Sequence, residues 1–274
     1  MHIPFEKYHG TGNDFIIIDN RKLFFPQNRK ESQELINSMC HRHFGIGADG
    51  LILIQDSQEA GFLMDYYNSD GLPGSFCGNG SRCAVAFAYR NDIIKDTSIR
   101  FAAADGIHHA DIYPGTQKLT TVAVTINEVT PPEQIDQNSY FADTGSPHMV
   151  VFLENIDSLD LATIGPKLRH ETRWNPEGTN VNFVEQLQNG KLYVRTYERG
   201  VENETLSCGS GVAASAIAAS VHYGKNSKYI GIYTKGGELK VMFNPPSADK
   251  PNFHRVILEG PAKLVYRGEL IHKK

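Results

Sequence analysis

The sequence predicts a mixed fold of strands and helices, built as two related halves that each wrap a layer of strands around one central helix. The motif Cys77-Gly78-Asn79-Gly80 recurs as Cys208-Gly209-Ser210-Gly211, 131 residues further along the chain. Each copy runs into an alanine-rich stretch that is small and apolar on every face, as expected of a helix enclosed by other elements. Strand-like runs surround both copies, so the two thiols are predicted to occupy equivalent places.

The separation of 131 residues holds at other positions. Tyr66 and Tyr197 each precede their cysteine by 11 residues. Further matches at 131 join 47–53 to 178–184 and Gly106 to Gly237, and a match at 133 joins 11–15 to 144–148. A recurrence over this length indicates an internal duplication, and one short insertion explains the drift near the start.

Length and composition fit two ordinary globular domains. The chain has 274 residues, of which 40% are hydrophobic and 21% are charged, so each half is large enough to bury a core. We expect the first half to span 1–126, with the C-terminal strand 264–274 as a candidate to complete it, and the second half to span 127–263. Pro131–Asn138, with two prolines and few apolar residues, is the predicted linker.

Charge and targeting features favour a cytoplasmic protein that acts on a small molecule. The net charge is -4 and the 27 Lys and Arg are scattered, so we expect no nucleic acid partner. Met1–Lys7 lacks the pattern of a signal peptide, and no apolar run reaches membrane-spanning length, so we expect no membrane partner. Four cysteines in such a chain are expected to be reduced.

Each half carries the elements that the predicted fold requires. In the first half, strands are predicted at Phe15–Asp19, Leu51–Gln55, Phe62–Asn68, Ile99–Ala103 and Val122–Ile126, and helices at Ser32–His43 and Asn79–Asn91. In the second half, strands are predicted at Met149–Phe152, Val181–Gln186 and Lys191–Tyr197, and helices at Leu159–Arg169 and Ser210–Tyr223. Asn189-Gly190 predicts a two-residue type I′ hairpin turn, and Gly236-Gly237 predicts a second.

The two motif cysteines stand where a thiol becomes reactive. A helix start presents unpaired N–H groups and a partial positive charge, which stabilise a thiolate and lower its pKa from about 8.5 towards neutrality. The N–H groups of two helix starts also suit a substrate carboxylate. Inversion at the α-carbon of an amino acid needs a base on one face and an acid on the other. One thiolate and one thiol supply both, without pyridoxal phosphate or any other cofactor.

Other readings of the cysteines are weaker. A single Cys-Gly pair at a helix start is more often structural than catalytic, and only the duplication reverses that preference. Cys40 and Cys83 are interpreted as small core residues. A zinc site built from Cys77, Cys83 and His41, His43, His108 or His109 lacks the spacing of known zinc ligands, so no metal is expected. A thioredoxin-like site needs two cysteines separated by two residues, which this sequence does not contain.

Five segments together resemble the diaminopimelate epimerase family. They are Gly10–Phe15, Asn68–Gly71, Cys77–Gly80, Tyr197–Gly200 and Cys208–Gly211, in the family's order and over nearly the whole chain. The resemblance implies a cofactor-independent isomerase that interconverts LL- and meso-2,6-diaminopimelate in lysine biosynthesis. It also implies two pseudo-symmetric halves, each a strongly curved, mostly antiparallel sheet around a central helix, with the active site in the cleft between them.

The resemblance assigns roles to individual residues. Cys77 and Cys208 become the exchanging acid and base, supported by His148 and Glu198. The residues matched to substrate binding are Asn13, Asn68, Gly78, Asn79, Asn180, Glu198, Arg199, Gly209 and Ser210. This set offers the donors and acceptors that a diamino dicarboxylate substrate requires. A homodimer is compatible with the resemblance.

Departures and rivals are also visible in the sequence. Some family members have Gln where this chain has Gly50, and many have Asn where it has Ser146, which concerns contacts to the distal end of the substrate. Proline racemases and hydroxyproline epimerases are the closest rivals, and they typically carry His where this chain has Asn79. A non-catalytic amino-acid binding protein or a thiol redox sensor is the alternative of another class, but two poised thiols exceed what binding needs.

Overall fold

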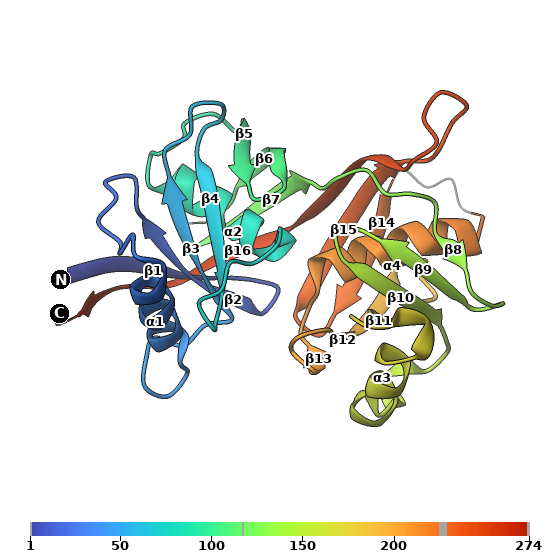
Figure 1. Ribbon diagram of the computed structural model, residues 1–274. Coiled ribbons are helices and arrows are strands. Elements are labelled where there is room, and N and C mark those ends of the chain that lie inside the picture. The colour runs from blue at the N-terminus through green and yellow to red at the C-terminus, as the bar shows by residue number, and fades with distance from the viewer. Residues whose placement is uncertain (1, 117, 225–228, 273–274) are drawn as a thin grey trace. The chain divides into compact units, whose positions relative to one another are not determined.

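The chain folds into two compact units in a computed structural model that describes residues 2–116, 118–224 and 229–272 (Figure 1). The first unit comprises Met1–Val124 and Gly260–Lys274, and the second comprises Thr125–Glu259. The predicted boundary lay after residue 126. The segment predicted as a linker, 131–138, lies within the second unit, where β8 (Glu133–Gln134) pairs with β9 (Ser139–Asp143). That prediction was wrong because two prolines can also flank a short edge strand.

The strands of the first unit follow one another around the sheet in chain order. They are β1 (His2–Gly10), β2 (Asn13–Asp19), β3 (Gly50–Gln55), β4 (Leu63–Asn68), β5 (Ser98–Ala103), β6 (Gly106–Pro114), β7 (Leu119–Thr125) and the C-terminal part of β16 (His254–Ile271). The pairs β2–β3 and β4–β5 are parallel and the other pairs with a determined register are antiparallel. Because β16 also pairs with β1, the sheet closes on itself.

Helix α2 (Gly78–Arg90) occupies the interior of this closed sheet (Figure 1). Its residues from Gly78 to Ala88 are all buried, and it contacts strands β1, β2, β3, β4 and β6. The apolar character on every face therefore has the cause predicted from the sequence, namely enclosure by strands.

The second unit repeats the strand pairing of the first. Its strands include β10 (Pro147–Phe152), β11 (Asn180–Gln186), β12 (Leu192–Glu198), β13 (Asn203–Thr205), β14 (Tyr229–Thr234) and β15 (Gly237–Asn244), and β15 pairs with β16. The parallel pairs are β10–β11 and β12–β14, which correspond to β2–β3 and β4–β5. This shared order of parallel and antiparallel pairs is the structural form of the internal duplication.

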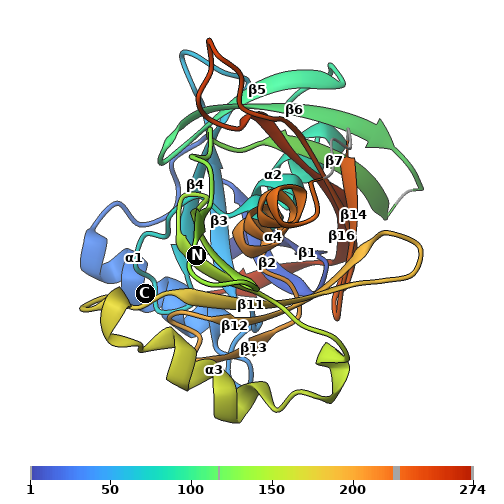
Figure 2. The same cartoon turned by 90° about the vertical axis from the view of Figure 1, so that its right-hand side faces the viewer.

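Helix α4 (Gly209–His222) is the enclosed helix of the second unit. Val212 to Ala219 are all buried, and the helix contacts β9, β10, β11, β12, β14 and β15. Helix α3 (Leu161–Arg169) packs on the opposite face of β11 and β12 (Figure 2). Side chains alternate along β11, so Val181 and Phe183 join the core under α3, while Asn180 and Asn182 point to the face of α4.

Helix α1 (Arg29–Cys40) begins and ends three residues before the predicted helix 32–43. It starts early because Asn28 caps it, with a side chain that accepts from the amides of Lys30 and Glu31. It ends at Cys40 because the returning chain caps the carbonyls there: the amides of Ile46 and Gly47 both donate to Met39. The other three predicted helices agree with α2, α3 and α4 to within two residues.

The first predicted type I′ turn has another geometry. Gly190 has a φ of 79°, but Asn189 has no positive φ. The amide of Gly190 donates to the carbonyl of Leu187, and the amide of Leu187 donates to the carbonyl of Lys191. This is a three-residue loop in which one glycine takes the left-handed position, so the length of the loop was misjudged.

The second predicted turn is displaced by one residue. Thr234 pairs with Gly237, so Lys235 and Gly236 form the turn between β14 and β15. Gly237, with a φ of 137°, already belongs to β15. A type I′ turn does form where none was predicted: Thr11 and Gly12, with φ of 50° and 88°, join β1 to β2 and place Asn13 at the start of β2.

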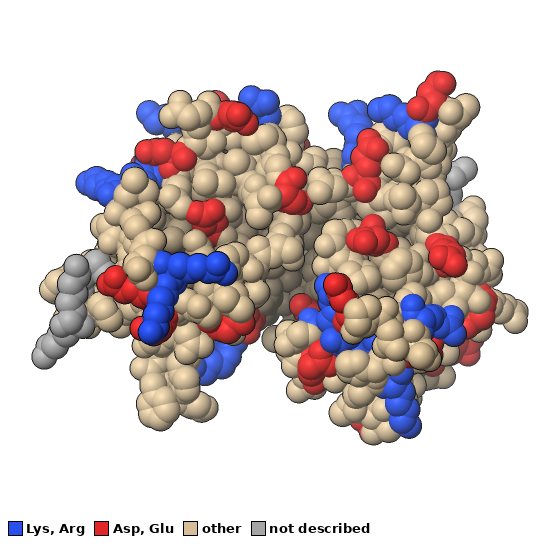
Figure 3. Space-filling model, in the orientation of Figure 1, with Lys and Arg blue, Asp and Glu red and all other residues tan. Residues whose placement is uncertain are grey.

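Lys, Arg, Asp and Glu side chains of both signs are scattered over the face drawn in Figure 3. Within the described parts of the chain, no helix is both long and apolar enough to pass through a membrane.

Candidate functional site

Cys77 is the N-cap of α2, as the sequence predicts. Its φ and ψ of -121° and 108° are extended, and its Sγ accepts from the amide of Gly80 at 3.4 Å. The thiol donates to Oδ1 of Asn13 at 3.8 Å, and Nδ2 of Asn79 donates to the same oxygen at 3.3 Å. Three of the predicted site residues of the first unit therefore meet at the start of α2.

Arg82 supports this group from inside the helix. It is completely buried, and its guanidinium donates to Oδ1 of Asn79 at 2.9 Å, to the carbonyl of Gly78 at 3.3 Å and to Oγ1 of Thr11 at 3.4 Å. Burial lowers the pKa of Arg82 to about 10, although the nearby Cys83 and Cys77 act in the opposite direction. Sequence reasoning missed Arg82, although an arginine within an alanine-rich helix was a usable signal.

Asn13 is fixed from its other side by acidic and basic side chains. Its Nδ2 donates to Oδ2 of Asp49 at 2.8 Å, which leaves Oδ1 facing Cys77. Asp49 in turn pairs with Arg42, which also binds Asp14, and Asp14 binds the buried Lys7 at 2.7 Å. Burial alone would raise the pKa of Asp14, but hydrogen bonds from Arg42 and Lys7 outweigh it and lower the pKa to about 2.

Asn68 lies at the end of β4, where it pairs in register with Gly50. A Cβ at Gly50 would lie 2.6 Å from Cε2 of Tyr66 and 2.6 Å from the carbonyl oxygen of Tyr67. The departure at Gly50 therefore has a packing cause, because Tyr66 occupies the space that a side chain would need. Asn68 itself is exposed, and its carbonyl accepts from the amide of Gly71.

Cys208 is the N-cap of α4, with φ and ψ of -109° and 114°, and it is 8% exposed. Its Sγ lies 3.5 Å from Oγ of Ser210, and this hydroxyl lies 3.0 Å from Nε2 of His148. His148 is fully buried, and burial, followed by the positive charge of Arg199, lowers its pKa to about 3. The imidazole is neutral at physiological pH.

Asn182 completes this arrangement, and sequence reasoning missed it. Its Nδ2 lies 3.1 Å from Nδ1 of His148 and donates to the carbonyl of Met149 at 3.1 Å, while Thr196 donates to its Oδ1 at 2.9 Å. Asn182 is completely buried. The alternation of Asn180, Val181 and Asn182 was the signal, because it places both asparagines on one face of a strand.

The remaining predicted residues of the second unit lie at the ends of β11 and β12. Asn180 donates to the carbonyl of Pro147 at 2.9 Å and accepts from the amide of Arg199 at 2.8 Å. Glu198 accepts from Oγ1 of Thr205 at 2.9 Å, and the guanidinium of Arg199 lies 3.3 Å from Glu177. The backbone of this β-strand end is thus tied to Asn180.

The other two cysteines lie in the cores, as predicted. Cys40 and Cys83 are both buried, and burial raises the pKa of Cys40 to about 12 and raises that of Cys83 further. None of the four cysteines forms a disulfide. No group of three or more His, Cys, Asp or Glu side chains in the described residues is placed to hold a metal ion.

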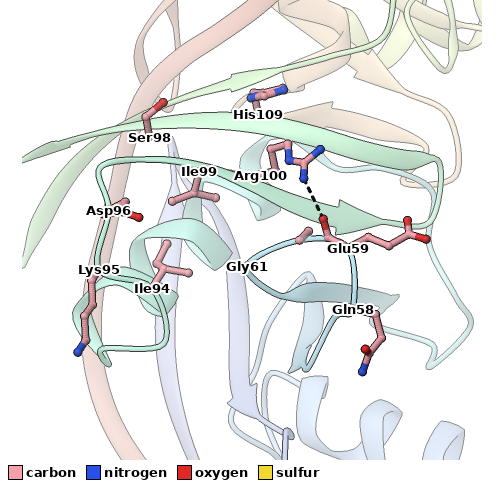
Figure 4. Close-up of a pocket in the computed structure, with 11 residues that line it drawn as sticks. Gln58, Glu59, Gly61, Ile94, Lys95, Asp96, Ser98, Ile99, Arg100 and His109 are labelled. Carbon is pink, nitrogen blue, oxygen red and sulfur yellow. Dashed lines mark hydrogen bonds between the residues drawn. The ribbon is translucent and has the colours of Figure 1, made fainter.

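A surface cavity of about 630 Å³ lies elsewhere in the first unit (Figure 4). It is lined by Gln58, Glu59, Ala60, Gly61, Ile94, Lys95, Asp96, Ser98, Ile99, Arg100 and His109. Arg100 donates to the carbonyl of Glu59 across it. None of the predicted site residues lines this cavity, so the chemistry is assigned to the helix starts, where those residues gather.

Comparison with known proteins gives one family. The family model described as diaminopimelate epimerase matches twice, at residues 5–130 and 140–265. The chain is 45% identical to the diaminopimelate epimerase of Flavobacterium psychrophilum, covering 95% of this chain and 97% of that protein. It is 42% identical to that of Chlorobaculum tepidum, covering 95% and 98%. The two matches of one family model agree with the duplication seen in the sequence.

Solved structures with a similar fold are far more distant in sequence. A PhzF-family phenazine biosynthesis protein of Bacillus anthracis has a TM-score of 0.74 at 13% identity, covering 99% of this chain and 100% of that one. A probable proline racemase of Agrobacterium radiobacter has a TM-score of 0.73 at 15% identity, covering 99% and 93%. These likenesses show the fold of two strand-rich, helix-centred units, as predicted.

Proposed function

This chain belongs to the diaminopimelate epimerase family and is an isomerase, and from this membership we propose that it interconverts LL- and meso-2,6-diaminopimelate in lysine biosynthesis. The substrate is a diamino dicarboxylate, and the reaction runs without a cofactor. The observation that carries the proposal is the pair of cysteines that cap matching helices, Cys77 on α2 and Cys208 on α4.

The two cysteines act as base and acid. The thiolate of one removes the α-proton, so that the C–H bond breaks and an S–H bond forms, and the thiol of the other delivers its proton to the opposite face of the carbon. The roles exchange when the reaction runs in reverse. Negative charge on the substrate is stabilised by the N–H groups that open α2 and α4, including those of Gly78, Asn79, Gly209 and Ser210.

The polar side chains hold the substrate in register. Asn13 and Asn79 already share a hydrogen bond beside Cys77, and Asn180 binds the backbone of Arg199. We assign Asn13, Asn79, Asn180 and Arg199, together with Asn68 and Glu198, to the amino and carboxylate groups of the substrate. His148 supports Cys208 through Ser210. A cytoplasmic location is proposed as well, and it is supported by the four cysteines, none of which forms a disulfide.

Exchange with solvent tests substrate and mechanism together. LL-diaminopimelate incubated with reduced protein in deuterated water should gain α-deuterium as the meso isomer appears, because each inversion delivers a solvent-derived proton. Mass spectrometry and chiral chromatography measure both. A protein that leaves diaminopimelate unlabelled but labels proline or hydroxyproline would instead be a racemase of the proline type.

Single cysteine variants test the two-base assignment. Cys77→Ala and Cys208→Ala should each lower kcat by about 10²–10⁴-fold, because each face of the carbon needs its own proton-transfer group. Cys40→Ala, which changes a core thiol, is the matched control and should retain epimerisation. Full activity of either active-site variant would exclude the two-base mechanism.

A further inference from the structure

A hydrogen-bond chain within the second unit connects strand β11 to Cys208. Nδ2 of Asn182 lies 3.1 Å from Nδ1 of His148, Nε2 of His148 lies 3.0 Å from Oγ of Ser210, and this oxygen lies 3.5 Å from Sγ of Cys208. Asn182 and His148 are completely buried. Whether these hydrogen bonds favour the thiol or the thiolate of Cys208 depends on which group donates in each of them.

The amide of Asn182 can lie only one way round. Thr196 donates its hydroxyl to Oδ1 at 2.9 Å, and the carbonyl of Met149 accepts from Nδ2 at 3.1 Å. A reversed amide would set its oxygen against the carbonyl oxygen of Met149, and both groups only accept. The contacts with the carbonyl of Met149 and the hydroxyl of Thr196 therefore orient the amide so that Nδ2, which only donates, faces His148.

The proton of His148 follows from that donor. Because an amide NH₂ cannot accept, Nδ1 of the neutral imidazole is the acceptor and the ring proton is on Nε2. Nε2–H then donates to Oγ of Ser210, which leaves the hydroxyl proton of Ser210 available to Sγ of Cys208. The charged group that acts on His148 is Arg199, which opposes protonation of the ring.

The first turn of α4 leaves room for Asn182 and His148. A Cβ at Gly211 would lie 2.3 Å from Oδ1 of Asn182 and 3.3 Å from Cε1 of His148, so only glycine lets α4 approach them. The corresponding positions of the first unit, which are all described, carry apolar side chains. Phe15 matches His148 by the offset of 133 residues, and Ile52 lies two residues after Gly50, the partner of Phe15, just as Asn182 lies two residues after Asn180, the partner of His148. Phe15 and Ile52 are both buried.

We propose that Asn182 is a positioning residue, which fixes His148 as the Nε2–H tautomer so that Ser210 donates a hydrogen bond to Cys208 and favours the thiolate there. The proposal gives Cys208 a resting state within the proposed function, but the tautomer can be measured without any assay of epimerisation. A wrong tautomer and a wrong proposed function would therefore be detected by different experiments.

Nitrogen NMR of histidine tests the tautomer directly. In protein labelled with ¹⁵N-histidine, the signals of His148 are assigned by their loss in His148→Gln, and chemical shifts show which ring nitrogen carries the proton. The unmodified protein should have Nδ1 unprotonated and Nε2 protonated. A proton on Nδ1 in this protein would overturn the proposal, and this measurement requires no variant of Asn182.

The isosteric substitution Asn182→Asp reverses the polarity of the first bond. A carboxylate oxygen accepts from Nδ1, so a proton should appear on Nδ1 of His148. Asn91→Asp makes the same chemical change at the end of α2, where Asn91 donates to the carbonyl of Phe87, and should leave the His148 signals unchanged. Identical tautomers in the unmodified protein and N182D would contradict the role of Asn182.

The alkylation rate of Cys208 tests the hydrogen bond between Ser210 and Cys208. Ser210→Ala removes the hydroxyl that faces Cys208, and iodoacetamide should then modify Cys208 about tenfold more slowly at pH 7, because the thiolate loses a hydrogen bond. Ser220→Ala, on the same helix, removes a hydroxyl that donates to the carbonyl of Ile217 in its own turn and should leave the rate unchanged. An unchanged rate in S210A, measured on the Cys208 peptide by mass spectrometry, would refute the final link.

Discussion

Cys77 and Cys208 cap matching helices, yet their hydrogen-bond neighbours differ. Cys77 faces Oδ1 of Asn13, which can only accept, and Cys208 faces the hydroxyl of Ser210. The cysteines themselves could be predicted because the repeat and the helix start are local in sequence. Supporting residues such as Arg82 and Asn182 left a weaker signal in the sequence, because their roles arise when strands and turns far apart in sequence meet the helix start.

The substitution Arg82→Met tests the support of Asn79. We expect about a tenfold lower kcat/KM, because Oδ1 of Asn79 loses its donor at 2.9 Å and keeps only the longer bond from Thr11 at 3.5 Å, so the amide is held less firmly. The free energy of unfolding should change little, because an apolar side chain also relieves a buried charge. Steady-state kinetics and urea unfolding measure the two effects, and an unchanged kcat/KM would contradict the assignment. Arg90→Met, on the same helix, is the control.

The lowered pKa of Asp14 makes the free energy of unfolding depend on pH. Its pKa is about 2 in the folded protein and 3.8 in an unperturbed chain, so its contribution is complete above about pH 4 and is lost as the pH falls through 2. We expect about 1–2 kcal/mol from this group, allowing for solvent screening. Urea unfolding from pH 7 to pH 2 should show a flatter profile for Asp14→Asn, whereas Asp96→Asn, at an exposed position, should keep the original profile.

Among the elements, the enclosed helices and the strands that were predicted agree with the structure better than their ends do, whereas β1, β6, β9, β14 and β15 were not predicted. Small apolar residues on every face indicate the enclosed helices, and the alternation of polar and apolar residues indicates β11. The ends depend on caps formed elsewhere: α1 begins where Asn28 caps it and ends where Ile46 and Gly47 return to Met39. The loop at Asn189-Gly190 was misjudged because the same dipeptide suits loops of two or three residues.

Helix α3 packs so closely on β12 that glycine is required at their contact. A Cβ at Gly165 would lie 2.4 Å from Cγ of Tyr197. Helix propensity alone predicts that Gly165→Ala stabilises the protein by up to about 1 kcal/mol. We expect the opposite, a loss of about 1–3 kcal/mol, because the helix must move away from Tyr197. Urea unfolding decides between the two signs.

At the scale of the whole molecule, the second unit is inserted into the first. Residues His2–His9 of β1 pair with Lys263–Ile271 of β16, so the first unit contains both ends of the described chain. A chain that ends at Gly260 should therefore lose hydrogen-exchange protection in β1 and β7 while α4 keeps its protection, because β9 to β12, β14 and β15, which α4 contacts, all remain. Equal loss in α4, or unchanged protection in β1, would contradict this division.

The pairing of β1 with β16 also sets the order in which a growing polypeptide can fold on the ribosome. The second unit is continuous in sequence and can fold as soon as it has left the ribosome. The first unit begins to be synthesised earlier, but the closing strand of its sheet is translated only after the second unit. Until β16 is translated, β1 therefore presents an unpaired edge, the kind of surface with which another chain can pair.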